Sequence, residues 1–420
     1  METGLNNEHK AQDKIVESAF KKRQIVMEKE NQKAGSENTS DNNPISSGNE
    51  SLDSLRRKID EIDKGLIRLL AERQGKVDKM VSLKKAHNLP VHHPAREENM
   101  ISERRSLGSE MGLDPDYLEE MFRAVMRRSR VDQTGSISRM GIRPGSVVLI
   151  VGGTRGMGRY FYSWFSRSGY IARSMGSGDW DNIESLCSGI DLAMISVPIG
   201  STESVIKRIA AYLPAGCVLA DVTSIKTHPM KAMMDSHKGP VVGLHPLFGP
   251  TTSSMDKQII VTTPGRDTDA CKWLNEQLAA WGAVLVQSDP KEHDDIMAVV
   301  QALRHFATFV FGRFLFLRKM DLFRTLEFSS PIYRLELGMV GRLFAQEPAL
   351  YSEIIFASPE RRALLKDYIA SITECIDMVE EEDKEEFIRQ FSHIAEWFGP
   401  FSEQAMREST FLIEKLIERF

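Results

Sequence analysis

The chain has 420 residues, enough for roughly two to four domains that each bury a sizeable core. Its 41% hydrophobic and 27% charged residues exclude a fully disordered, collagen-like or disulfide-dense protein. The formal net charge of −5, from 54 basic and 59 acidic side chains, gives no overall attraction for nucleic acid or an anionic membrane, so an anionic ligand would need a local cluster of cations.

The cysteines and the N-terminal residues indicate the cellular compartment. The four cysteines are too far apart for a Cys-x-x-Cys metal site or a disulfide framework, so we expect reduced thiols and no metal. No apolar run approaches the ~18 residues of a membrane span, and the polar N-terminal residues lack the apolar core of a signal peptide. These features predict a cytoplasmic protein without a nucleic-acid or membrane partner.

The N-terminal part changes character near residue 51. Residues 1–50 consist mainly of Asn, Ser, Glu, Lys and Gln, which cannot bury enough apolar surface to offset chain entropy, so we predict a disordered tail. From Leu52 onward, apolar residues recur in steps of three and four, which predicts one long helix to about His87. The stripe of this helix consists of Leu52, Leu55, Ile59, Ile62, Leu66 and Leu69.

Two shorter helices follow the first. A helix over 96–107 is predicted after Pro94, and Gly108 to Gly112 would then loosen the chain. Asp114 followed by Pro115 is an N-cap with proline in the first turn, which predicts the start of the third helix. The three helices indicate an all-α domain over residues 51–135, followed by a glycine-rich linker over 136–145.

The remainder of the chain divides into an α/β part and a helical part. Short apolar runs alternate with helical stretches over residues 146–288, a pattern typical of a Rossmann-like sheet. Strand signals end at Asp289, and helical patterns then continue to Phe420, which predicts an all-α domain over 289–420 with a candidate dimerisation surface. The predicted strands are Val147–Val151, Ile171–Met175, Leu192–Val197, Val218–Val222, Val241–Leu244, Ile259–Thr262 and Val284–Val286.

Cations interrupt the apolar stripe of the first helix. Four residues after Leu69 the stripe reaches Arg73, and about three turns later Lys84 returns to nearly the same face. Burying a cation costs free energy unless the cation is paired, so one explanation for Arg73 and Lys84 is that they bind an anionic ligand. The other explanation is that their aliphatic stems are buried while their charged ends reach solvent. Arg56 lies about 100° off that face and would serve a site only by reaching another chain.

The segment from Ser51 to about Gln133 resembles the all-helical chorismate mutases. The resemblance implies an intertwined homodimer that rearranges chorismate to prephenate with preorganised charge alone, without acid, base or cofactor. One position departs from some relatives, because His93 stands where they have Asp. The matching positions are Leu55-Arg56, the run Leu66–Gln74 with Arg73, Lys84, Arg96-Glu97, and Ser129 with Gln133.

Roles in the mutase site follow by position from this resemblance. Arg73, together with Arg56 from the other chain, would clamp the two carboxylates of chorismate. Lys84 and Gln133 would hydrogen-bond the ether oxygen as its bond breaks. Glu97 would hold the ring hydroxyl, and the supporting residues would be Arg96 and Ser129.

A glycine-rich loop follows the first predicted strand and precedes an aromatic-rich helix, the context that a dinucleotide fingerprint requires. Arg155 replaces the middle glycine, so the loop is either a phosphate cradle or only a tight turn. The second strand ends in Gly176, where an Asp or Glu would bind the adenosine ribose, which weakens the preference for NAD over NADP. We predict NAD as the cofactor, with NADP not excluded, held by Gly152, Gly153, Gly156, Met157, Gly158, Ser196, Val197 and Pro198.

From about residue 146 to the C-terminus the chain resembles prephenate dehydrogenases, specifically the dehydrogenase half of the fused chorismate mutase/prephenate dehydrogenases. The resemblance implies oxidative decarboxylation of prephenate to 4-hydroxyphenylpyruvate in a homodimer, with L-tyrosine as the default inhibitor. The matching segments are Ser196-Val197-Pro198, Asp221–Lys226, Gly243–Pro250, Glu292–Asp294, Gln301–Phe309, Ser329–Leu337 and Val340–Gln346.

The dehydrogenase roles also follow from this resemblance. His245 would accept the ring-hydroxyl proton as hydride leaves, although a histidine before proline is also a common turn residue. Ser224 would orient His245 and the substrate, and Arg342 would bind a substrate carboxylate unless it forms an interhelical ion pair. Further substrate-binding positions would be Arg334 and His305, while Lys226, His237 and His293 match family positions with less defined roles.

Two other functions compete with this interpretation. The first is a chorismate mutase whose dehydrogenase half has decayed into an aromatic-ligand-binding regulatory module, an idea prompted by Arg155 and Gly176. The presence of His245, Ser224 and Arg342 argues against decay. The second is a generic NAD-dependent hydroxyacid dehydrogenase with an unrelated helical appendage, which would not need cations on the N-terminal helices.

Overall fold

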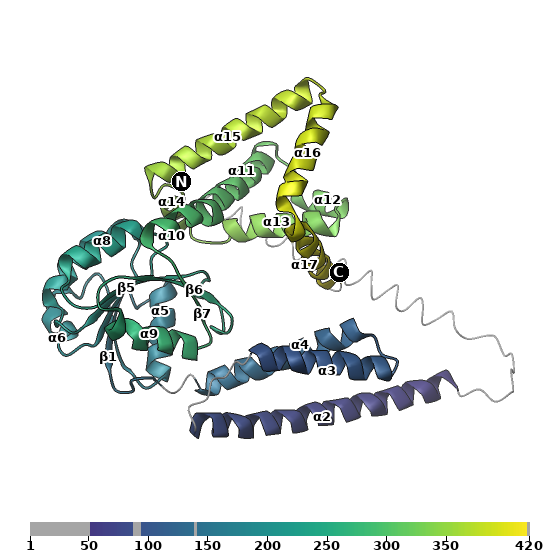
Figure 1. The fold of residues 1–420 in the computed structure, drawn as a ribbon, viewed down its shortest axis with the longest axis horizontal. Coiled ribbons are helices and arrows are strands. Elements are labelled where there is room, and N and C mark those ends of the chain that lie inside the picture. The colour runs from purple at the N-terminus through teal and green to yellow at the C-terminus, as the bar shows by residue number, and fades with distance from the viewer. Residues whose placement is uncertain (1–50, 87–93, 138–140, 418–420) are drawn as a thin grey trace, which may run out of the picture. The chain divides into compact units, whose positions relative to one another are not determined.

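The computed structural model describes residues 51–86, 94–137 and 141–417 (Figure 1). Side chains are described for these residues except those at 84–86, 94–95 and 131–137. The tail predicted over 1–50 and His93 lie outside the described residues. The chain divides into two compact units, Met1–Arg73 and Gln74–Phe420. Among the described residues, no helix is long and apolar enough to cross a membrane.

Three helices form the N-terminal part, as predicted: α2 (Leu52–Ala86), α3 (Pro94–Glu110) and α4 (Pro115–Ile137). Asp114 caps α4, since its Oδ1 accepts the backbone N–H of Asp116 at 2.7 Å. Helix α4 includes the first residues of the linker predicted at 136–145. The apolar stripe of α2 is exposed, from 44% at Leu55 to 65% at Leu52.

The prediction that Gly108 loosens the chain is wrong. Gly108 is helical and lies within α3, where a Cβ atom would stand only 1.8 Å from Cδ1 of Leu118 on α4. The glycine therefore permits α3 and α4 to pack closely, and it is Gly112, with a φ of +77°, that turns the chain between them.

The α/β part contains a seven-stranded sheet in the order β2-β1-β3-β4-β5-β6-β7. Strands β1 to β5 run parallel, β6 is antiparallel to β5, and β7 is parallel to β6. All seven predicted strands are confirmed, with boundaries shifted by a few residues. They are β1 (Val147–Val151), β2 (Ile171–Met175), β3 (Leu192–Ile195), β4 (Val218–Asp221), β5 (Val241–Pro246), β6 (Ile259–Pro264) and β7 (Val284–Gln287).

Helices cover both faces of this sheet (Figure 1). Alternate side chains of β1 enter different cores: Val148 and Ile150 pack with aromatic residues of α5 and α9, whereas Leu149 packs with α6, α7 and α8. Because both faces are buried, the central strands are apolar throughout, and the sequence pattern is continuous instead of alternating. The helices are α5 (Gly156–Arg167), α6 (Ile183–Cys187), α7 (Ile199–Ile209), α8 (Thr227–Ser236) and α9 (Thr268–Ala280).

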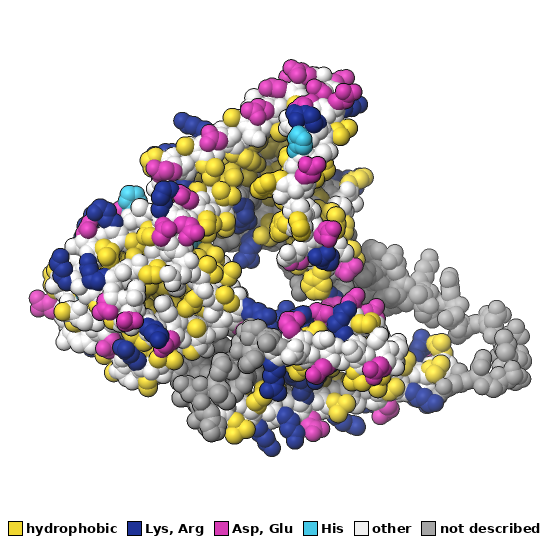
Figure 2. Space-filling view, in the orientation of Figure 1, with side chains coloured by type: hydrophobic (Ala, Val, Ile, Leu, Met, Phe, Trp, Pro, Cys, Tyr) yellow, Lys and Arg dark blue, Asp and Glu magenta, His cyan; other side chains and the backbone are white. Residues whose placement is uncertain are grey.

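The C-terminal part is helical, as predicted. Hydrophobic side chains gather along α15 and α16 (Figure 2), and large ones such as Phe391 and Trp397 are 65% and 81% exposed. A contiguous exposed apolar surface of this kind marks an interaction site. The helices are α10 (Pro290–Met297), the π-helix η3 (Ala298–Leu303), α11 (Arg304–Leu317), α12 (Leu322–Glu327), α13 (Pro331–Phe344), α14 (Pro348–Ile355), α15 (Pro359–Glu380), α16 (Lys384–Phe398) and α17 (Pro400–Ile417).

Candidate functional site

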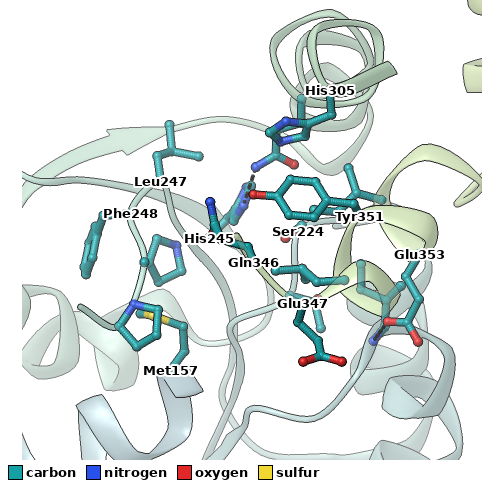
Figure 3. Close-up of a pocket in the computed structure, with 18 of the residues that line it drawn as sticks. Met157, Ser224, His245, Leu247, Phe248, His305, Gln346, Glu347, Tyr351 and Glu353 are labelled. Carbon is teal, nitrogen blue, oxygen red and sulfur yellow. Dashed lines mark hydrogen bonds between the residues drawn. The ribbon is translucent and has the colours of Figure 1, made fainter. Parts of the chain in front are cut away.

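A cavity of about 700 Å³ opens at the carboxyl ends of the parallel strands, where open α/β sheets bind their ligands (Figure 3). Loops after β3, β4 and β5 form one wall, and η3, α11, α13 and α14 form the other. In Figure 3, Tyr351 and His305 project into the cavity from the helices, and Leu247 and Phe248 line it from the loop after β5.

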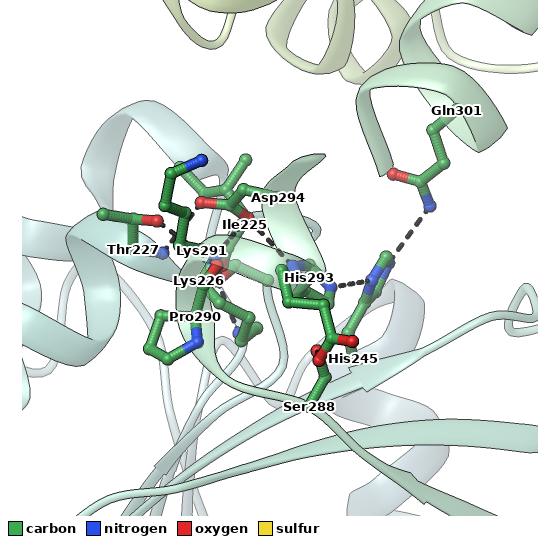
Figure 4. Close-up of polar contacts among 12 residues, drawn as sticks. Ile225, Lys226, Thr227, His245, Ser288, Pro290, Lys291, His293, Asp294 and Gln301 are labelled. Carbon is green, nitrogen blue, oxygen red and sulfur yellow. Dashed lines mark hydrogen bonds and ion pairs between the residues drawn. The ribbon is translucent and has the colours of Figure 1, made fainter. Parts of the chain in front are cut away.

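His245 lies in β5 at this edge and is 2% exposed. Its Nδ1 is 2.8 Å from Nε2 of His293, whose Nδ1 is 2.8 Å from Oδ1 of Asp294 (Figure 4). On its other side, His245 Nε2 is 3.1 Å from the amide nitrogen of Gln301. These contacts connect four side chains from β5, α10 and η3 in one chain of hydrogen bonds.

The hydrogen-bonding chemistry of Asp294, His293 and His245 indicates which ring nitrogen of each histidine carries a proton. An ionised Asp294 only accepts, so Nδ1 of His293 donates to it and Nε2 of His293 is an acceptor. His245 must then donate from Nδ1, which leaves the lone pair of its Nε2 directed toward the amide of Gln301 and the cavity. The arrangement places an unprotonated imidazole nitrogen at the cavity wall.

Burial sets the charge of this histidine. Desolvation, followed by the neighbouring His293 and Lys226, holds the pKa of His245 well below its ordinary value, so the ring is neutral at pH 7. For Asp294, burial alone would raise the pKa, but hydrogen bonds from His293, Thr227 and Lys226 outweigh it and lower the pKa far below its usual range. The pair therefore combines a neutral base with an ionised carboxylate.

The loop after β4 presents Ser224 to the cavity. Lys226 is fully buried and forms an ion pair with Asp221, and its Nζ is 3.2 Å from Oγ1 of Thr223. Thr223, which also lines the cavity, contacts Asp221 Oδ2 through its Oγ1, and the same hydroxyl lies 3.0 Å from the carbonyl oxygen of Ile225. Lys226 therefore stabilises the loop through buried contacts and does not line the cavity. Its backbone N–H donates to Oδ1 of Asp294.

Cationic and polar groups lie on the helical wall. Arg304 and Arg342 both line the cavity, and His305 packs edge-on against Tyr351 with ring centroids 4.8 Å apart. Burial, and then the adjacent Arg304, lowers the pKa of His305 to about 4, so its ring is also neutral at pH 7. Two fixed cations are therefore available for a substrate with two carboxylates.

Arg334 does not join this group. Its guanidinium donates to the carbonyl of Leu326 at 2.5 Å, and the residue is not part of the cavity wall, contrary to the expectation of substrate contact in this chain. The reason is geometric, because Arg334 and Arg342 are eight residues apart on α13 and the helix directs only the later one to the cavity.

The glycine loop after β1 has the shape of a phosphate cradle. Gly152 has a φ of +87°, and a Cβ atom on Gly158 would lie 2.2 Å from the carbonyl oxygen of Gly152, so both positions require glycine. Arg155 precedes α5 with extended backbone and is exposed, so it does not obstruct the loop. The N–H groups at the start of α5 are suited to a pyrophosphate.

Asp179 compensates for the missing carboxylate at the end of β2. Its Oδ2 accepts the backbone N–H of Gly176 at 2.7 Å and lies 3.5 Å from where a Cβ atom of residue 176 would stand. A carboxylate is therefore present where the ribose of a dinucleotide is normally recognised. The residues present fit NAD.

The mutase candidates lie on the three N-terminal helices α2, α3 and α4. Ser129 is buried and donates to the carbonyl of Val125 at 2.9 Å, and Glu97 accepts from Arg130 at 2.6 Å. Arg96 and Arg56 are exposed, and Arg73 is half-buried on α2. Lys84 and Gln133 have side chains outside the described residues.

Several cavity residues were not singled out from the sequence. Gln301 and Arg304 lie in a segment that matched the dehydrogenases, but the helical pattern did not reveal that η3 directs Gln301 to His245. Glu353 is the clearest case, because its Oε2 accepts the backbone N–H of Ile199 at 2.8 Å across 154 residues of sequence. Other such cavity residues are Glu347 and Tyr351.

Comparison with known proteins gives matches over most of the chain. Residues 55–134 match the family model for chorismate mutase type II, 171–287 the nucleotide-binding domain of prephenate dehydrogenase, and 289–393 its dimerization domain. The T-protein of Enterobacter agglomerans is 42% identical over 86% of this chain and 97% of that protein, and the T-protein of Haemophilus influenzae is 38% identical over 87% and 97%.

A solved structure shares the fold of the dehydrogenase part. The crystal structure of prephenate dehydrogenase from A. aeolicus, in complex with hydroxyphenyl propionate and NAD+, matches with a TM-score of 0.50 and 19% sequence identity. The match covers 60% of this chain and 97% of the other. At this level of identity the likeness concerns the fold alone.

Proposed function

This chain belongs to the T-protein family and is a bifunctional enzyme of tyrosine biosynthesis, and from that premise we propose which residues perform its two reactions. The helical N-terminal domain rearranges chorismate to prephenate, and the following domains oxidatively decarboxylate prephenate to 4-hydroxyphenylpyruvate with NAD+. A single observation supports the assignment of the second reaction, namely the hydrogen-bonded chain from Asp294 through His293 to His245 at the cavity wall.

His245 is the proposed general base. Its Nε2 lone pair would replace the Gln301 contact with one from the C4 hydroxyl of prephenate and take that proton as the C4–H bond breaks. NAD+, when bound at the glycine loop and at Ser196–Pro198, supplies the hydride acceptor. The imidazolium that forms on His245 would be stabilised through His293 by the ionised Asp294 behind it.

Cations on the helical wall would orient prephenate. We assign its two carboxylates to Arg342 and Arg304, because both residues line the cavity and a planar guanidinium matches the geometry of a carboxylate. His305, neutral at pH 7, is suited to a hydrogen bond with the pyruvyl side chain, and Ser224 faces the same space from the loop after β4. Loss of CO₂ then yields the aromatic product.

The mutase reaction needs only fixed charges. We propose that Arg73, Lys84 and Gln133 bind the carboxylate and ether oxygens of chorismate, and that Arg56 comes from a second copy of the chain. The exposed apolar stripe of α2 supports such a dimer, since a stripe of this length requires a partner in water. The remaining assignments are Glu97 for the ring hydroxyl, with Arg96 and Ser129 in support.

Two further properties complete the proposal. The apolar surface of the C-terminal helices supports a homodimer, and the matched dimerization-domain model agrees with this. We also propose inhibition by L-tyrosine, because its ring and carboxylate match those of the product, and a cytoplasmic location.

One assay tests both activities. Chorismate is supplied with NAD+, and the loss of chorismate is followed beside the formation of reduced cofactor. We expect both signals from the parent enzyme and only the first from a His245→Asn variant, because a missing general base lowers the rate by about 10²–10⁴-fold. Loss of chorismate without cofactor reduction in the parent would instead identify the dehydrogenase half as a decayed binding module.

A further inference from the structure

One arginine connects helices α3 and α4 to the loop between β5 and β6, all within the unit Gln74–Phe420. Arg130 on α4 is 8% exposed, and its Nη1 is 2.6 Å from Oε2 of Glu97 on α3. The Nε atom of the same guanidinium is 3.0 Å from Oδ2 of Asp256, which belongs to the loop between β5 and β6. The side chains of Glu97 and Asp256 are 16% and 8% exposed, so the whole cluster is shielded from water.

The guanidinium geometry makes this contact directional. Arginine presents its N–H groups in a rigid plane, so a carboxylate fixed at Nε limits where Nη1 can point. A lysine in the same place would act as a point charge without this constraint. Asp256 therefore determines the orientation of Arg130, and Arg130 in turn determines the orientation of the Glu97 carboxylate.

Asp256 itself is held firmly by the dehydrogenase domain. Its backbone N–H donates to Oγ of Ser254 at 3.0 Å, and the next N–H, of Lys257, donates to the carbonyl of Gly282 at 2.9 Å. Gly282 packs so closely that a Cβ atom there would lie 2.9 Å from Cα of Asp256. The preceding residue, Met255, is completely buried in the sheet core.

The same loop begins at the dehydrogenase cavity. Residues Leu247 to Pro250 line that cavity, and the chain then continues to Asp256. The loop between β5 and β6 thus lines the dehydrogenase cavity at one end, and at the other end it contacts Arg130, which binds the carboxylate of Glu97.

We infer that Arg130 is a positioning residue of the mutase site, and that Asp256 of the dehydrogenase domain completes that site by fixing Arg130. The inference rests on the proposed role of Glu97 as acceptor for the ring hydroxyl of chorismate. Arg130 touches no substrate, and it acts by holding the Glu97 carboxylate in the orientation that the hydroxyl requires. The mutase domain is therefore not self-sufficient, because part of its active-site support lies in the dehydrogenase fold.

The test uses the full-length enzyme and measures mutase and dehydrogenase kinetics separately. Arg130→Gln and Asp256→Asn are each expected to lower mutase kcat/KM by about 10- to 100-fold, with prephenate oxidation changed less than twofold. Asp256→Asn keeps the side-chain shape, so it tests the idea even if Arg130→Gln folds poorly. The matched control is Arg123→Gln, since Arg123 also bridges α4 to α3, through Glu98 at 3.0 Å, but makes no contact with Asp256.

A double-mutant comparison separates positioning from a general structural role. In a Glu97→Gln background, adding Arg130→Gln should cause little further loss of mutase activity, because both changes remove the same contact. Fully additive losses, or equal losses in Arg123→Gln, would overturn the inference. If Glu97→Gln alone leaves the mutase unchanged, the proposed role of Glu97 fails instead, and the inference fails with it.

Discussion

Replacing His293 tests whether the second histidine decides the protonation state of the first. His293→Leu removes the acceptor that lies 2.8 Å from Nδ1 of His245 and supplies no other hydrogen-bonding group. The Nδ1–H of His245 would then be a buried donor without a partner, which costs about 1–3 kcal/mol. The ring can escape this cost by moving its proton to Nε2, the nitrogen that must accept the substrate proton.

The size of the effect follows from that cost. A penalty of about 1–3 kcal/mol corresponds to a factor of about 5 to 150 in the tautomer ratio. We therefore expect kcat for prephenate oxidation to fall by about 10- to 100-fold, with little change in KM, because His293 is not part of the cavity wall. Reduced-cofactor formation at saturating prephenate measures this, and chorismate loss in the same preparation should stay unchanged.

A second buried histidine provides the control. His237 is 3% exposed and its Nε2 contacts the carbonyl of Cys217 at 2.7 Å, away from the cavity. His237→Leu removes a buried hydrogen bond of the same kind and should lower the thermal midpoint without lowering kcat. The reasoning is refuted if His293→Leu retains more than half of the parent kcat, or if His237→Leu loses as much as His293→Leu.

Three further predictions concern stability, cofactor choice and substrate binding. The pKa of His305, about 4, and that of His245 both lie below the unfolded value of about 6.5, so the unfolded state binds more protons than the folded state. The free energy of unfolding should therefore fall as the pH decreases from 6.5 toward 4. Urea titrations at several pH values measure this, and a free energy that stays constant would contradict it. Asp179→Asn should raise kcat/KM with NADP relative to NAD by about tenfold, and an unchanged ratio would exclude Asp179 from ribose recognition. Arg342→Ala should raise KM for prephenate by about 10- to 100-fold, whereas Arg334→Ala should change it little; equal effects would contradict the placement of the two side chains.

The local pattern of the sequence was sufficient for the elements and for part of the site. Each strand of the sheet is a short apolar run, and burial on both faces explains why these runs are continuous. The glycine spacing after the first strand indicated the dinucleotide loop, and the structure shows why glycine is needed there: Gly152 has a positive φ and lies against Ser196, and Gly158 lies against Gly152. His245 was singled out by the resemblance of Gly243–Pro250 to prephenate dehydrogenases, and it lies at the end of β5, at the edge where parallel sheets bind ligands.

The sequence pattern was insufficient where the role of a residue depends on how the chain turns back on itself. Gly108 seemed a chain breaker because helix propensity is local, yet its lack of a side chain accommodates Leu118 of the next helix. At the end of β2 the sequence offers Gly176 in place of an acid, and only the fold shows that the following turn brings the carboxylate of Asp179 to the backbone N–H of Gly176. Both outcomes depend on the path that the chain takes through the turn, which hydrophobic periodicity does not report.

The convergence of polar groups was decided by tertiary structure. His245 and His293 are 48 residues apart, and Glu97 and Asp256 meet only because Arg130 lies between them. Hydrophobic periodicity reports which side of an element is buried, since burial of apolar area is non-directional and depends on local spacing. A hydrogen bond instead requires two particular atoms within about 3 Å, and only the packing of complete domains brings such atoms together.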